Sequence, residues 1–211
     1  MSDNRQNIIN ATERLLQTKG LARLTTREIA REAKVTEGLL YHHFMDKAEL
    51  IYEVVETRVS DSRNLLQNLP LQVGTRTLPD ILEDVLHAIY LVHYDIVLLI
   101  CLIFTDQQLR LRMREIMEEK NIGPRRTIEI LSVFLAAEQR MGRLSDAVDP
   151  WAAARCLWLI IIQFAMEDRL MGRKPDDAHV REEIRSYLQT MMKGLAPDSS
   201  SADKTGAKKT K

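Results

Sequence analysis

The segment TEGLLYHHFMDK, residues 36–47, gathers side chains that could bind the phosphates and bases of a nucleic acid. Leu40 and Phe44 are four residues apart, so on a helix both lie on one inward face. A hydroxyl or phenol can donate to a phosphate oxygen, an imidazole can donate to a guanine acceptor, and a glycine lets a backbone approach sugar and phosphate closely. The residues that could make such contacts are Thr36, Glu37, Gly38, Leu39, Tyr41, His42, His43 and Lys47.

Three short helices are expected to position this segment. The first covers residues 5–19, where an apolar stripe recurs with helical spacing, and it ends before Gly20. The second begins at Thr25, three residues before Glu28, which is the spacing of a capping box. The third begins at Thr36 after a turn of two or three residues. Helix, short turn and helix form the outline of a helix-turn-helix, which presents its second helix to the major groove of DNA.

The rest of the chain predicts longer helices. Asp46 is expected to cap a fourth helix that runs to about Leu66, and the turn-forming residues 69–79 are expected to connect it to a fifth helix. Only 8 glycines and 6 prolines in 211 residues favour an all-α protein of about nine helices. The remaining helices are expected at about 80–104, 106–120, 125–141, 150–171 and 177–193. The expected parts are a helix-turn-helix domain (1–47), a larger helical domain (48–195) and a mobile polar tail (196–211).

The charge balance does not by itself indicate a nucleic-acid partner. The chain has 30 basic and 30 acidic residues, and residues 23–47 hold five basic residues against four acidic ones. This small local excess predicts specific binding with a modest dependence on salt, rather than a broadly basic surface.

Several functional classes are not indicated by the sequence. The first residues are polar, which argues against a secretory signal and favours a cytoplasmic protein. The apolar runs 96–104 and 157–166 are shorter than the roughly 18–20 residues of a membrane span, so we expect core helices, with Cys101 and Cys156 as buried reduced thiols. No nucleophile elbow, P-loop or dinucleotide-binding glycine pattern appears, so we expect no enzyme, no cofactor and no metal site.

The stretch LTTREIAREAKVTEGLLYHHFMDKAEL resembles the DNA-binding domain of the TetR family of transcriptional regulators, and the resemblance covers about residues 8–55. It implies three N-terminal helices that bind DNA, and C-terminal helices that bind a ligand and form a dimer. It also implies a repressor that binds a palindromic, double-stranded operator and is released by a small, largely apolar effector. By position, Thr26 and Arg27 look like contacts from the second helix, and Glu37, Gly38, Leu39 and His42 lie where sequence is read. Phosphate contacts are implied for Thr36, Tyr41, His43 and Lys47.

Two residues depart from the family pattern. Lys34 stands where the family usually has a glycine in the turn, and a left-handed backbone there costs a side-chain-bearing residue about 1 kcal/mol. A phosphate contact made by Lys34 would offset that cost. Glu37 either accepts a hydrogen bond from a cytosine amino group or simply faces solvent, and the sequence leaves both alternatives open.

The C-terminal helices carry a few polar or polarisable side chains within apolar stretches, as a small-molecule pocket requires. The resemblance implies such a pocket, and the residues we expect to line it are Tyr90, His93, Tyr94, Phe104, Met113, Trp158 and Gln163. For these positions the alternative is an ordinary core, and for His93 a satisfied buried histidine is favoured. The wide apolar faces of residues 150–171 and 177–193 predict a homodimer through these two helices.

Two other functions fit the same sequence. One is an all-helical small-ligand carrier or enzyme whose helix-turn-helix no longer binds DNA. The other is a regulator that binds no ligand and acts through partner proteins.

Overall fold

The computed structural model describes residues 2–19 and 24–193, and within these ranges every regular element is a helix, which confirms the all-α prediction. The predicted tail at 196–211 lies outside the described residues. The elements are α1 (Ser2–Lys19), α2 (Thr26–Ala33), α3 (Glu37–His43), α4 (Lys47–Gln67), a short 3-10 helix η2 (Leu69–Gln72), α5 (Leu78–Thr105), α6 (Gln107–Glu119), α7 (Pro124–Arg140), α8 (Pro150–Leu170) and α9 (Asp177–Lys193).

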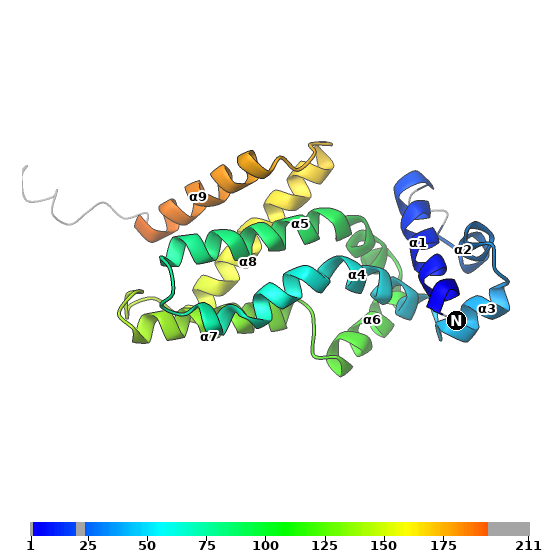
Figure 1. Cartoon of the computed structure of the whole chain (residues 1–211), viewed down its shortest axis with the longest axis horizontal. Helices are drawn as coiled ribbons and strands as arrows, with labels where there is room; N and C mark the ends of the chain where they lie inside the picture. The colour runs from blue at the N-terminus through cyan, green and yellow to red at the C-terminus, as the bar shows by residue number, and fades with distance from the viewer. Residues whose placement is uncertain (1, 20–23, 194–211) are drawn as a thin grey trace, which may run out of the picture.

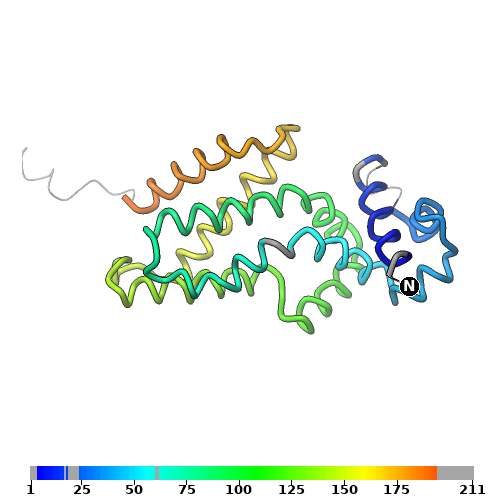
Figure 2. Tube along the Cα trace, in the orientation of Figure 1, coloured from blue at the N-terminus to red at the C-terminus, as the bar shows by residue number. Residues whose placement is uncertain are grey.

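The helices are arranged as a small head and a larger body (Figure 1). The head consists of α1, α2 and α3 at one end of the molecule, and the body consists of α4 to α9. α4 leaves the head and runs beside α5, which packs in turn against α8 and α9, as the tube view also shows (Figure 2). α3 therefore lies at the outer end of the head, away from α7, α8 and α9.

Local side-chain caps start the helices where the sequence predicts. The Thr25 hydroxyl accepts from the Glu28 amide at 3.2 Å, the Thr36 hydroxyl accepts from the Leu39 amide at 3.1 Å, and Asp46 Oδ1 accepts from the Glu49 amide at 2.8 Å. Each cap satisfies an amide that has no partner within its own helix. The caps at Thr36 and Asp46 fix the positions at which the two turns that flank α3 end.

Lys34 ends α2 in the left-handed region, with φ 57° and ψ 40°, as its position in the turn predicts. The Val35 amide donates to the Ala30 carbonyl at 2.9 Å, and the Lys34 amide donates to the Arg31 carbonyl at 3.2 Å. This pair of bonds is the Schellman arrangement, and Val35 also packs on the core that contains Ala30. The chain therefore makes the sharp turn between α2 and α3 without a glycine.

Two apolar clusters hold the molecule together. The body core is built mainly from α5, α7, α8 and α9 and includes Tyr90, Phe134 and Phe164. The head core contains residues of α1 to α4, but it also takes in Ile96, Leu99 and Leu102 of α5 and Leu109, Met113 and Ile116 of α6. Because one cluster spans head and body, the end of α5 and the apolar side of α6 share a continuous core with the head.

One prediction about the apolar runs needs correction. Both cysteines are exposed, so the expected buried thiols at Cys101 and Cys156 are wrong. The run at 96–104 belongs to the 28-residue helix α5, which is long and apolar enough to cross a membrane by length and composition. A helix in the core of a protein can have the same length and apolar composition. α5 supplies much of the body core, including Ile81, Leu82, Val85, Leu86, Ile89 and Tyr90.

Candidate nucleic-acid interface

The outward face of α3 is exposed to solvent. Leu40 and Phe44 are almost fully buried in the head core, while Tyr41 is 51% exposed. Glu37, Gly38 and His42 are also exposed, and Leu39 and His43 are half-buried at the edges of this face. The spacing of Leu40 and Phe44 therefore predicted correctly which side of the helix points outward.

Side chains of α2 and α3 meet beside this face. The Tyr41 phenol and the Thr26 hydroxyl are 3.5 Å apart, and the Thr26 hydroxyl donates to Glu37 Oε2 at 3.4 Å. Both distances are at the long end for a hydrogen bond, so these groups are aligned but only weakly held. Three residues predicted separately as DNA contacts thus form one cluster. Glu37 is both solvent-exposed and adjacent to Thr26, which leaves its two interpretations open.

The cations of the head fall into two groups. Four arginines of α1, α2 and α4 are neutralised by acids within the fold: Arg5 by Glu53, Arg14 by Glu32, Arg31 by Glu28 and Arg58 by Glu13. Within residues 2–19 and 24–193, Arg27, Lys34 and Lys47 have no acidic partner. These three cations lie on α2, in the turn before α3 and at the start of α4, so they bracket α3. The positive charge of these three residues is therefore concentrated around the outward face of α3, although the chain as a whole is neutral.

Gly38 is not required by the fold. A Cβ built on Gly38 would meet only the Thr36 hydroxyl within 4 Å, at 3.9 Å, and the backbone there is not in the left-handed region. A glycine within a helix costs roughly 0.5–1 kcal/mol of stability relative to alanine. No close contact among the described residues explains why a glycine stands at this position. An approaching sugar–phosphate backbone would account for it.

Of the seven predicted effector contacts, four lie together in the body. The Tyr90 and Tyr94 rings stack with their centroids 6.2 Å apart, and the His93 ring meets the Trp158 ring edge-on at 6.0 Å. The other three lie elsewhere. Phe104 is 68% exposed at the end of α5, Gln163 is exposed and bonds to Glu167, and Met113 is buried in the head core.

The polar groups of this cluster are largely occupied. The Tyr90 phenol, fully buried, donates to Asp168 Oδ2 at 2.7 Å, and Arg173 pairs with Asp168 Oδ1 at 3.1 Å. Burial and the bond to Asp168 raise the pKa of Tyr90 above its ordinary value, so the phenol keeps its proton. The Tyr94 phenol donates to the Arg173 carbonyl at 2.7 Å. Sequence reasoning missed Asp168 and Arg173, because they are 78 and 79 residues from their tyrosine partners.

His93 Nδ1 has a hydrogen-bond partner, whereas Trp158 Nε1 has none among the described residues. His93 Nδ1 lies 2.8 Å from the Ile89 carbonyl, and burial lowers the pKa of His93, so the ring is neutral and Nδ1–H donates. Trp158 Nε1 is buried and has no acceptor among the described residues. A buried donor without a partner costs about 1–3 kcal/mol, so Trp158 offers a hydrogen bond that the folded chain does not use.

Apolar side chains are exposed along α8, one of the two helices predicted to form a dimer. Trp151, Leu159, Met166 and Leu170 are 39%, 50%, 46% and 80% exposed, and Cys156 lies among them. On α9, Met191 and Met192 are also exposed. Apolar surface of this extent on adjacent helices is what an interface with another chain requires.

Comparison with known proteins shows that the chain is similar to bacterial regulators. Residues 8–54 match the family described as bacterial regulatory proteins, tetR family. Over 200 residues the chain is 27% identical to the probable HTH-type transcriptional regulator ArpR of Pseudomonas putida, and the match covers 89% of each protein.

Two crystal structures have the same fold. NalD, the secondary repressor of the MexAB-OprM multidrug efflux pump in Pseudomonas aeruginosa, is 24% identical with a TM-score of 0.68, and the match covers 94% of this chain and 98% of NalD. FadR from Bacillus subtilis, in complex with stearoyl-CoA, is 17% identical with a TM-score of 0.68, and the match covers 90% of this chain and 99% of FadR.

Proposed function

Because residues 8–54 match the tetR family of bacterial regulatory proteins, we propose that the chain is a regulator of this family that binds a palindromic operator through the outward face of α3 and is released by a small, largely apolar effector. The observation that carries this proposal is the exposure of Tyr41, His42 and Gly38 on α3, bracketed by unpaired cations. A face of that kind serves base contacts in a groove, with phosphate contacts on both sides.

Each residue of the face has a proposed role. Arg27, Lys34, Thr36, Tyr41, His43 and Lys47 position the head on phosphates, since their groups donate hydrogen bonds or carry positive charge. Thr26 holds the Tyr41 phenol and the Glu37 carboxylate, which supports its assignment to the same site. Glu37, Leu39 and His42 face the base edges, and Gly38, which lies among them, lets the sugar–phosphate backbone approach the helix closely.

The operator is bound by a homodimer. The exposed apolar stripe of α8 that contains Leu159 and Met166 supports pairing through α8 and α9, as a two-fold four-helix interface. Two heads related by a two-fold axis would reach half-sites about 34–36 Å apart, one turn of DNA. The operator is accordingly palindromic.

The effector is proposed to bind beside Tyr90, His93, Tyr94 and Trp158, where Trp158 Nε1 provides a free donor to an acceptor on the ligand. Phe104, Met113 and Gln163 lie away from this cluster, so we place them outside the proposed effector site. The complex of FadR with stearoyl-CoA supports an effector that has a long apolar part in this fold. Release requires that the effector bind the DNA-free state more tightly than the DNA-bound state.

In this role the protein acts as a repressor in the cytoplasm, without enzymatic activity, cofactor or membrane insertion. The packing of α5 against α4, α8 and α9 supports a core helix rather than a membrane span.

Fluorescence anisotropy with the labelled DNA that flanks its own gene tests the proposal. We expect saturable binding that exceeds binding to a shuffled duplex of the same composition, with a modest salt dependence. Absence of any binding at low salt would instead favour the small-ligand carrier.

A further inference from the structure

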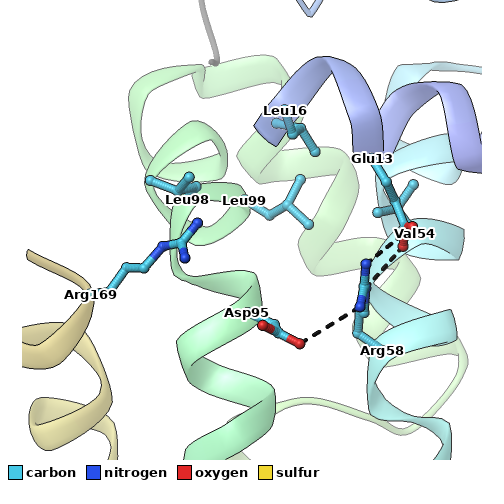
Figure 3. Close-up of a pocket in the computed structure, with 8 residues that line it drawn as sticks. All are labelled: Glu13, Leu16, Val54, Arg58, Asp95, Leu98, Leu99 and Arg169. Atoms are coloured by element: carbon cyan, nitrogen blue, oxygen red, sulfur yellow. Dashed lines mark hydrogen bonds and ion pairs between the residues drawn. The ribbon is translucent and has the colours of Figure 1, made fainter. Parts of the chain in front are cut away.

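A crevice of about 170 Å³ lies where the head meets the body (Figure 3). Its walls come from α1, α4, α5 and α8, and none of the residues predicted to contact DNA or the effector lines it. We call it the junction crevice. Its apolar part is formed by Leu16 of α1, Val54 of α4, and Leu98 and Leu99 of α5. Four charged side chains surround the rest: Glu13, Arg58, Asp95 and Arg169.

A chain of ion pairs crosses one side of the junction crevice. Arg58 of α4 pairs with Glu13 of α1 through two bonds, at 3.0 and 3.2 Å, and its Nη1 lies 3.8 Å from Asp95 Oδ2 of α5. Figure 3 draws these contacts on the side opposite Arg169. Arg58 therefore links the head to α5, and its charge is already balanced by Glu13.

Arg169 is the charged group of the crevice that lacks a counter-ion. Within residues 2–19 and 24–193 it has no acidic partner, and its guanidinium lies 5.0 Å from the centroid of the Tyr94 ring. Neighbouring acids are otherwise engaged, since Asp168 pairs with Arg173 and Glu13 pairs with Arg58. The stacked arginine is thus held in position beside Leu98 and Leu99 with its hydrogen-bond donors unused.

We propose that the junction crevice binds a small amphipathic anion, with its carboxylate on Arg169 and its apolar part against Leu98 and Leu99. The volume suits a compact molecule, because pockets for drug-sized ligands are about 300–1,000 Å³. Arg169 can bind a carboxylate through two parallel hydrogen bonds. Asp95 of α5, whose carboxylate points toward Arg58 in Figure 3, limits the affinity by repulsion and keeps the ligand carboxylate on the Arg169 side.

Occupancy of the crevice would couple to the position of the head. A ligand there touches α1 of the head and both α5 and α8 of the body, so its affinity depends on how these parts are placed. This regulatory consequence rests on the proposed DNA-binding function. Binding of the anion itself does not.

A titration of the full chain with benzoate, followed by ligand-observed NMR in the absence of DNA, tests the site. Benzyl alcohol and benzylamine serve as neutral and cationic probes with the same ring. We expect millimolar or tighter binding of benzoate, and at least about tenfold weaker binding of both other probes, since each lacks the charge-assisted bond to Arg169.

Three variants decide the assignment. Arg169→Met should weaken benzoate binding by about tenfold, and Asp95→Asn should strengthen it a few-fold because a like charge is removed. Arg125→Met, at an exposed arginine of α7 without an ion-pair partner among the described residues, should change nothing. Unchanged binding in Arg169→Met, tighter binding of benzylamine than of benzoate, or no benzoate binding would overturn the proposal.

The coupling is tested separately once operator binding is established. By linkage, operator DNA should change the benzoate dissociation constant by the same factor as benzoate changes that of the operator. A benzoate affinity that is identical with and without DNA would remove the regulatory part.

Discussion

Arg112 of α6 and Asp46, the residue that caps α4, form an ion pair with Nε 2.9 Å from Oδ2, although 66 residues separate them. The other carboxylate oxygen of Asp46 accepts from the Glu49 amide at 2.8 Å. Asp46 thus caps the first turn of α4 and also connects that turn to α6 in the body. The contact lies directly beside Lys47, a proposed phosphate contact.

Breaking this pair should loosen the head rather than unfold the chain. Asp46→Asn keeps a good helix cap but removes the charge, and Arg112→Met removes the partner. Both groups are partly exposed, so we expect little change in the urea midpoint of unfolding. Operator affinity should fall several-fold in each variant, and the double variant should fall no further. Additive losses in anisotropy titrations would show that the two residues act independently.

The left-handed Lys34 offers a stability prediction. Lys34→Gly should raise the free energy of unfolding by about 1 kcal/mol, because glycine adopts this backbone conformation without strain. Lys34→Ala keeps the strain and should give no such gain. Both variants lose one phosphate contact, so operator affinity should fall equally in the two. Urea denaturation together with anisotropy separates these effects. A gain for alanine as large as that for glycine would contradict the explanation.

Acid should destabilise the body through the half-buried imidazole of His93. Burial lowers the pKa of His93 in the folded chain, so below about pH 6.5 the unfolded chain binds a proton that the folded chain resists. The neutral His93 ring therefore contributes to the free energy of unfolding at neutral pH, and this contribution is lost as the pH falls below about 6.5. His93→Phe should reduce the difference between the urea midpoints at pH 7 and pH 5. An undiminished difference would assign the acid sensitivity to other groups, such as His87, whose pKa burial also lowers.

The two exposed cysteines report on the proposed dimer. Cys156 lies among the exposed apolar residues of α8, whereas Cys101 is on α5. In the dimer a maleimide should modify Cys101 rapidly and Cys156 slowly, and dilution below the dissociation constant should equalise the two rates. Mass spectrometry of tryptic peptides measures both. Equal rates at high protein concentration would argue against pairing through α8.

Local features of the fold could be predicted from the sequence, because they depend on residues close together in the chain. The caps at Thr25, Thr36 and Asp46 need only a side chain and an amide three residues later. The outward face of α3 could be predicted in the same way from Leu40 and Phe44. The left-handed backbone at Lys34 was indicated only by the family resemblance, because the family usually has a glycine at that position.

Features that depend on distant packing could not be predicted. Helical periodicity shows that Tyr90 is inward, but it gives no sign that Asp168 accepts its hydrogen bond. It likewise places Met113 on an apolar face of α6 without showing that this face packs on the head core. The cysteines were expected to be buried because each lies in an apolar run, yet both point outward. An apolar run alone does not separate core from an interface with a second chain.

The central claim, that DNA lies against α3, is tested most directly by operator binding of Gly38→Ala. The fold leaves room for the added methyl group, whose nearest contact would be Thr36 Oγ1 at 3.9 Å, so the variant should be more stable by roughly 0.5–1 kcal/mol. We predict that this more stable protein binds its operator at least about tenfold more weakly, because the methyl group would collide with the DNA backbone. Operator affinity equal to or above that of the unmodified chain would contradict the account.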